Sequence, residues 1–228
     1  MIHMNSAQTV PIEAVQQYWN QRPCNIRHST RPGGTREYFD EVEQRKYFVE
    51  PHIPVFAQFE RWNGKNVLEI GCGDHAEAWE LAERGLDVTA IDISGVAVSH
   101  ARERAAEEQR SHLTFEEMNA EALEFDDSSF DAVLGAGILH HLDLDVAIPE
   151  VARVLRPGGV GIFLEPLGLN PVLNLYRRVT PGERTPDEHP LLRADLRAME
   201  RWFEQVDLQF FHLASLAALP LIKSDAFD

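Results

Sequence analysis

Short apolar segments alternate with helical patterns between residues 65 and 165, and this alternation constrains the fold more than any other feature. Strands joined by helices at such intervals form parallel βαβ units with right-handed crossovers. Strands that are apolar along nearly their whole length are typical of a sheet covered on both faces. We therefore predict an α/β fold, Rossmann-like and doubly wound, with a mostly parallel sheet flanked by helices. The expected strands are residues 66–70, 87–91, 113–117, 130–134 and 160–164.

The first 64 residues differ from the rest, because they are rich in aromatic side chains and lack the alternating pattern. Pro-Gly-Gly at 32–34 divides this part into two pieces. The second piece, 35–60, has a helical pattern that Pro51 and Pro54 interrupt. Residues 1–64 are accordingly predicted to form an N-terminal helical cap or lid.

The remaining residues, 65–228, are predicted to form the domain that contains the sheet, with a substrate-side insertion at about 166–190. This insertion is rich in specific polar groups. Beyond it, 192–203 has a helical pattern, 206–211 is predicted to be a sixth strand, and 213–222 looks helical.

A glycine turn follows the first strand and precedes the first helix of this domain. Gly71 and Gly73 allow a tight turn and a close approach of a ligand to the backbone, and the helix N-terminus adds N–H donors. Asp92 ends the next strand, near the offset at which a carboxylate accepts hydrogen bonds from ribose hydroxyls. Ligands of such sheets bind beyond the carboxyl ends of the strands, so an adenosine-containing ligand is expected there. Candidate positions at these ends are Gly71, Asp92, Asn119, Gly135 and Glu165.

The turn alone does not choose between two cofactors. Gly71, Gly73 and Ala76 fit the dinucleotide pattern G-x-G-x-x-A, which leaves an NAD(P)-binding oxidoreductase open. Glu69 and Asp74 place negative charge beside the turn. These carboxylates would repel a pyrophosphate and attract a cationic ligand, so they favour a sulfonium compound.

Several segments in order resemble one family. Residues 67–73, Val-Leu-Glu-Ile-Gly-Cys-Gly, resemble motif I of the class I S-adenosylmethionine (SAM) dependent methyltransferases. Asp92, Asn119-Ala-Glu121, Phe130-Asp-Ala-Val133 and Leu155-Arg-Pro-Gly-Gly159 resemble that family's later segments, so the likeness covers residues 65–165. One departure is His75, which stands where the family has the third glycine of motif I.

The resemblance implies SAM as cofactor, S-adenosylhomocysteine as product and a small organic molecule as methyl acceptor. It assigns the ribose hydroxyls to Asp92 and the SAM amino group to Glu69. Tyr18, with its neighbour Trp19, would belong to a lid over the cofactor or to simple aromatic packing of the cap. The implied cofactor-binding residues are Tyr18, Glu69, Gly71, Gly73, Asp92, Ile93, Asn119, Ala120, Glu121, Gly135 and Ala136.

Two histidines follow the fourth strand, on the side where an acceptor is expected. His140 and His141 are the candidate catalytic residues, because a histidine can take a proton from a hydroxyl near neutral pH. Either ring could instead hold its loop in place. Glu165 could bind a cationic substrate, orient a base, or form a salt bridge with Arg177 or Arg178.

Charge and composition limit the classes of partner that this chain is expected to bind. The formal net charge of −16 argues against a nucleic-acid substrate, and no apolar stretch reaches the length of a membrane span. Cys24 and Cys72 form no ligand or disulfide pattern, which favours a reducing, cytoplasmic setting. No metal-binding motif is present, so no metal site is predicted. A SAM-binding domain without catalysis is the remaining alternative.

Overall fold

The computed structural model describes residues 10–22, 29–62, 64–73, 76–180, 185 and 187–211. Five strands form one parallel sheet in the order β3-β2-β1-β4-β5. They are β1 (Asn66–Ile70), β2 (Asp87–Asp92), β3 (Leu113–Glu117), β4 (Phe130–Ala136) and β5 (Leu155–Leu164). Because the order reverses between β1 and β4, a crevice is expected beyond the carboxyl ends of these two strands.

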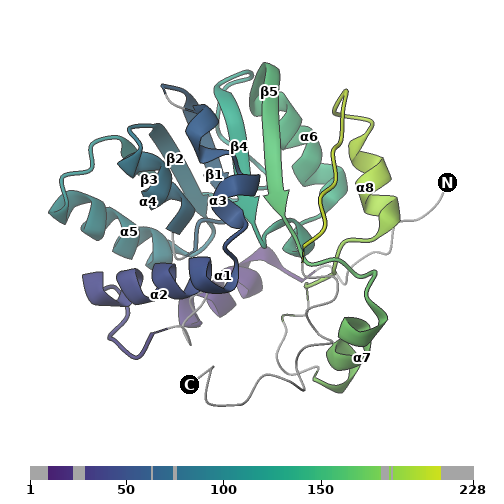
Figure 1. The fold of residues 1–228 in the computed structure, drawn as a ribbon, viewed down its shortest axis with the longest axis horizontal. Coiled ribbons are helices and arrows are strands. Elements are labelled where there is room, and N and C mark those ends of the chain that lie inside the picture. The colour runs from purple at the N-terminus through teal and green to yellow at the C-terminus, as the bar shows by residue number, and fades with distance from the viewer. Residues whose placement is uncertain are drawn as a thin grey trace.

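Helices cover both faces of the sheet, which confirms the doubly wound prediction. They are α1 (Ile12–Gln21), α2 (Arg36–Val49), α3 (Ile53–Phe56), α4 (Ala76–Glu83), α5 (Gly95–Glu107), α6 (Leu144–Val154), α7 (Pro171–Val179) and α8 (Arg193–Met199), with 3-10 turns η2 (Phe59–Trp62) and η3 (Leu139–His141). Figure 1 shows the sheet between its helices, with α1 and α7 beyond the carboxyl ends of the strands. None of the helices within the described ranges has the length and apolar character needed to cross a bilayer.

Side chains of alternate strand residues build two separate cores. On one face, Val67 and Leu134 pack with α4 and α5, where Trp79 is almost completely buried. On the other face, Leu68 and Val133 pack with α6, including Val151. Successive side chains of a strand point to opposite faces of the sheet, so a strand that is apolar along its length contributes to both cores.

Helix α1 contacts the start of α5, beyond the carboxyl end of β2. The side-chain oxygen of Asn20 in α1 accepts hydrogen bonds from the Ser94 hydroxyl (2.9 Å) and from Val96 N (3.3 Å). The helix predicted over 35–60 is divided as the prolines require: α2 ends at Val49, and α3 and η2 follow.

Helix α2 is attached to the sheet domain by two buried cations. Lys46 forms a 2.7 Å ion pair with Glu77, and both side chains are nearly buried. The Arg104 guanidinium lies 3.9 Å from the Trp79 ring centroid and 5.2 Å from that of Phe39. Arg104 thus contacts a ring of α2 and a ring of α4, and these cation–π contacts hold α2 against the sheet domain.

Two of the strand predictions differ from the structure. β5 begins at Leu155 rather than at 160, because an irregular register between Phe130 and Ala132 accommodates the Pro-Gly-Gly turn within the strand. The predicted strand over 206–211 is wrong: these residues are extended but join no ladder among the described residues. Their side chains pack instead, since the Phe211 ring stacks on His52 at 4.1 Å. The helix predicted over 213–222 lies outside the described residues.

Candidate active site

The glycine turn is fixed to the end of the neighbouring strand. Gly71 N and Cys72 N both donate to Ile91 O, at 2.8 and 3.0 Å. Gly71 has φ +69°, and a Cβ at this position would lie 2.7 Å from the Ile138 side chain. Only glycine therefore meets both the backbone conformation and the close approach. Asp74 and His75 lie outside the described residues.

Asp92 holds the turn and the next helix in register. One carboxylate oxygen accepts from Gly73 N at 2.8 Å, and the other accepts from Ser94 N at 2.7 Å. A carboxylate accepts hydrogen bonds from hydroxyl groups as well as from N–H groups, so a carboxylate fixed at this place is suited to the hydroxyls of a ribose.

A cavity of about 1010 Å³ lies beyond the carboxyl ends of β1, β2 and β4. Its side chains combine the Asp92 carboxylate with apolar groups such as Ile93 and Met118, a combination that fits an adenosine moiety. Most of the predicted cofactor residues line it, namely Gly71, Gly73, Asp92, Ile93, Asn119, Ala120, Glu121 and Ala136. Two of these also shape the wall: Asn119 accepts from Glu121 N (2.9 Å), and Glu121 accepts from Asp143 N (2.6 Å).

Three predicted cofactor residues lie elsewhere. Glu69 is 2% exposed, beneath the turn, and it is not among the described residues that line this cavity. Gly135 is also outside the lining, although a Cβ there would lie 2.7 Å from Ile138, which does line the cavity. Tyr18 faces a second cavity, whereas its neighbour Trp19 faces both.

The second cavity is larger, about 1890 Å³, and it adjoins the first. It extends along β5 toward α8. The residues shared by the two linings mark the junction, and they are Trp19, Gly71, Gly73, Ala136, Gly137 and His141. A molecule in one cavity can therefore meet a molecule in the other at the end of β4.

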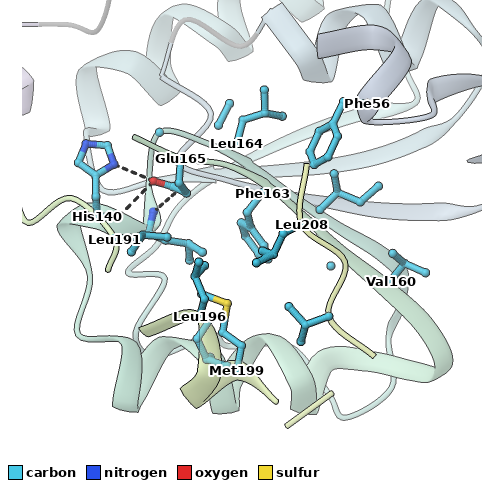
Figure 2. Close-up of a pocket in the computed structure, with 18 of the residues that line it drawn as sticks. Phe56, His140, Val160, Phe163, Leu164, Glu165, Leu191, Leu196, Met199 and Leu208 are labelled. Atoms are coloured by element: carbon cyan, nitrogen blue, oxygen red, sulfur yellow. Dashed lines mark hydrogen bonds and ion pairs between the residues drawn. The ribbon is translucent and has the colours of Figure 1, made fainter. Parts of the chain in front are cut away.

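His140 and Glu165 form a buried pair that lines the larger cavity, beside His141 of the junction (Figure 2). One Glu165 oxygen accepts from Ile138 N (2.9 Å) and Leu139 N (2.8 Å), and the other lies 2.8 Å from His140 Nδ1. A carboxylate only accepts hydrogen bonds, so Nδ1 must carry the proton. The Nε2 lone pair of neutral His140 is then available as a base.

His141 has a carboxylate partner of its own. Asp187 lies 2.8 Å from His141 Nδ1, and the Thr185 hydroxyl lies 3.3 Å from the same nitrogen. Burial of Asp187 opposes its ionisation, but the hydrogen bond and charge of His141 outweigh this effect and hold the pKa of Asp187 below its ordinary value. The Trp19 ring meets His141 edge-on at 5.4 Å, so α1 touches this pair directly.

Described residues of the segment 166–190 line both cavities, and Asp187 is one of them. Glu165 does not pair with Arg177 or Arg178; it binds His140 and the backbone instead, because three N–H groups of the loop after β4 converge on it. Arg177 donates to Leu167 O at 3.2 Å. Arg184 and the side chain of Tyr176 lie outside the described part.

Sequence reasoning missed Ile138 and Thr185. Both act through tertiary contact, against Gly71 and His141, and no local pattern marks them. Among the described residues, no group of three or more His, Cys, Asp or Glu side chains is placed to hold a metal ion.

Comparisons with known proteins agree with this geometry. A family model described as a methyltransferase domain matches residues 68–163. A fatty-acid O-methyltransferase of Mycolicibacterium smegmatis is 35% identical over 126 residues, which are 54% of this chain and 44% of that protein. The chain thus spans less than half the length of this relative.

Two further proteins are similar over more of their own length. A solved structure of a SAM-dependent methyltransferase from Methanosarcina mazei is 29% identical, with a TM-score of 0.53, covering 64% of this chain and 81% of that chain. A probable SAM-dependent methyltransferase of Mycolicibacterium smegmatis is 30% identical over 209 residues, which are 86% of this chain and 75% of the relative. With this match added to the glycine turn, the Asp92 carboxylate and the doubly wound sheet, the chain belongs to the SAM-dependent methyltransferases.

Proposed function

We propose that this chain transfers the methyl group of SAM to a small organic acceptor, which binds in the larger cavity. The observation that carries this proposal is the junction of the two cavities at Gly137 and His141. The donor would occupy one side of the junction and the acceptor the other. Because methyl transfer is an in-line displacement, such an arrangement contributes mainly by orienting the two partners.

The smaller cavity is the proposed SAM site, and its residues fit that cofactor. Asp92 would accept hydrogen bonds from the ribose hydroxyls, and Ile93 and Ala120 would enclose the adenine. The backbone at Gly71 and Ala136 would approach the methionyl part. Glu69 and Gly135 would act from beneath, by supporting the turn and Ile138, and Tyr18 would close the acceptor side.

We propose that His140 takes up the proton that the acceptor releases. SAM, when bound, supplies an already activated methyl group, so the chain has to handle only the proton of a hydroxyl acceptor. The Nε2 lone pair of His140 would receive this proton, and Glu165 would stabilise the resulting charge. His141 and Asp187 would fix the neighbouring wall and its contact with Trp19.

In this proposal each part of the chain has its own role. Residues 1–64 would form the cap that excludes water, and 65–228 the SAM-binding domain, with the insertion at about 166–190 closing the acceptor side. The net charge of −16 opposes nucleic-acid partners, and the buried thiol of Cys72 fits a cytoplasmic setting; Cys24 lies outside the described residues.

Calorimetric titration with SAM and S-adenosylhomocysteine tests the proposal, with NADH as the matched control ligand. We expect both sulfur compounds to bind and NADH not to bind. Binding of NADH alone would instead support an NAD(P)-binding oxidoreductase. If SAM binds but no acceptor is ever methylated, the domain is a SAM-binding module without catalysis.

A further inference from the structure

One half of the larger cavity is lined mainly by apolar side chains. Its apolar half is lined by side chains from α3, β5, α8 and the segment after α8, including Phe56, Phe163, Leu164, Leu196, Met199 and Leu208. Figure 2 shows these side chains converging on the same space, with His140 and Glu165 at one end. At about 1890 Å³ the cavity exceeds the roughly 300–1000 Å³ of an ordinary small-molecule site.

Residues 203–211, which we call the strap, enclose this apolar half. The strap runs beside β5, on the same side as α8 (Figure 1). At its start, Phe203 N donates to Met199 O at 3.2 Å. At its end, the Phe211 ring stacks on His52 at 4.1 Å and meets Phe56 edge-on at 5.6 Å. Because both ends are attached, Leu208 is held over the cavity between them.

The polar end of the cavity is negatively charged. Glu165 is buried there against His140, and Asp187, which lines the smaller cavity, is buried against His141 at the junction. An acceptor whose reacting head is a carboxylate would be repelled by these two groups. Of the cations that line more distant parts, Lys46, Arg153 and Arg156 form ion pairs with acidic side chains, and Arg61 donates to Gln58 at 3.1 Å. A neutral hydroxyl, by contrast, can donate to His140.

We propose that the acceptor is a neutral hydroxyl compound with a long apolar body, its hydroxyl at His140 and its body under the strap. This inference rests on the proposed function and deepens it. The observations that carry it are the apolar lining, the length of the cavity along β5 and the acidic surroundings of His140. Burial of the apolar body would supply most of the affinity, while the head would determine orientation.

Three probes separate the tail from the head. They are 4-octylphenol, 4-methylphenol (same head, short tail) and 4-octylbenzoate (same tail, charged head), each titrated into the protein loaded with S-adenosylhomocysteine at pH 7.5. Each buried methylene strengthens binding roughly fourfold, so burial of half of the seven additional methylenes should make 4-octylphenol bind about 100-fold more tightly than 4-methylphenol. The benzoate should bind at least about tenfold more weakly than 4-octylphenol.

A matched pair of variants locates the tail. Leu208→Asp introduces a carboxylate into the cavity at a half-exposed position, and Leu175→Asp introduces one on exposed α7, away from it. We expect Leu208→Asp to weaken the binding of 4-octylphenol at least about tenfold, because a carboxylate opposes burial of the apolar tail. The affinity for 4-methylphenol should be unchanged. Leu175→Asp should change neither.

Equal affinity for the two phenols, tightest binding of the benzoate, or no effect of Leu208→Asp would each overturn the inference. The first titration distinguishes this failure from failure of the proposed function. If S-adenosylhomocysteine binds but tail length does not matter, only the apolar acceptor is wrong. If S-adenosylhomocysteine does not bind, the proposed function itself falls, and this inference falls with it.

Discussion

Replacement of Glu165 by glutamine should move the proton of neutral His140 from one ring nitrogen to the other. In the native protein, the N–H groups of Ile138 and Leu139 donate to one Glu165 oxygen. The same two donors would hold the glutamine carbonyl at that position, because an amide NH₂ group there would face them. The new NH₂ group must then face His140 Nδ1, so Nδ1 becomes the acceptor and Nε2 takes the proton.

The size of the effect follows from the contacts that change. His140 N, which lies 3.3 Å from Glu165, loses its acceptor, and the remaining bonds lose their charge assistance. Together these changes should cost roughly 2 kcal/mol in the free energy of unfolding, measured in urea. Methyl transfer to a hydroxyl acceptor should fall by about 10²–10⁴-fold, since Nε2 no longer accepts a proton. Affinity for S-adenosylhomocysteine should change little.

Nitrogen-15 NMR of the histidine rings at pH 8 measures the tautomer directly, and a His140→Gln variant assigns the signals. The matched control is Asp187→Asn, the same carboxylate-to-amide change beside His141. It should shift the tautomer of His141 and leave that of His140 unchanged. A native His140 with its proton on Nε2, or no change in Glu165→Gln, would refute the reasoning.

Three further changes test other parts of the structure. Gly71→Ala should lower Tm by several degrees more than Gly64→Ala, because both glycines have φ +69° but only the first would bring a Cβ against Ile138; equal losses would contradict the close contact. Asp92→Ala should weaken the binding of S-adenosylhomocysteine by about 1–3 kcal/mol in calorimetry, and an unchanged affinity would show that Asp92 does not bind the ligand. Burial raises the pKa of Glu43 to about 7, so ionisation of Glu43 costs folded-state stability as the pH rises from the unfolded value through 7. Glu43→Gln should therefore stabilise the protein by about 1–2 kcal/mol at pH 8 and by almost nothing at pH 4, as urea unfolding at the two pH values would reveal.

The sheet and its cofactor turn could be predicted from local patterns. Each strand is a short apolar run, and Gly71 and Asp92 follow strands whose carboxyl ends must meet at one edge of a parallel sheet. The strand predicted over 206–211 failed because an alternating apolar and polar pattern of this kind does not specify its partner. A strand needs a neighbouring edge in register, and this segment packs Phe211 on His52 instead.

The sequence by itself determined the α/β class, the place of the glycine turn and the side of the sheet on which His140 and Glu165 lie, because these depend on spacing along the chain. Only the tertiary structure decided the pairing of His140 with Glu165 and of His141 with Asp187, and the meeting of two cavities at Gly137. These contacts join residues 25 and 46 positions apart, and a hydrogen bond of that kind depends on how loops pack beyond the strands. Local propensity carries no information about such packing, so the two candidate histidines could be named from the sequence but the contacts that pair them with carboxylates could not.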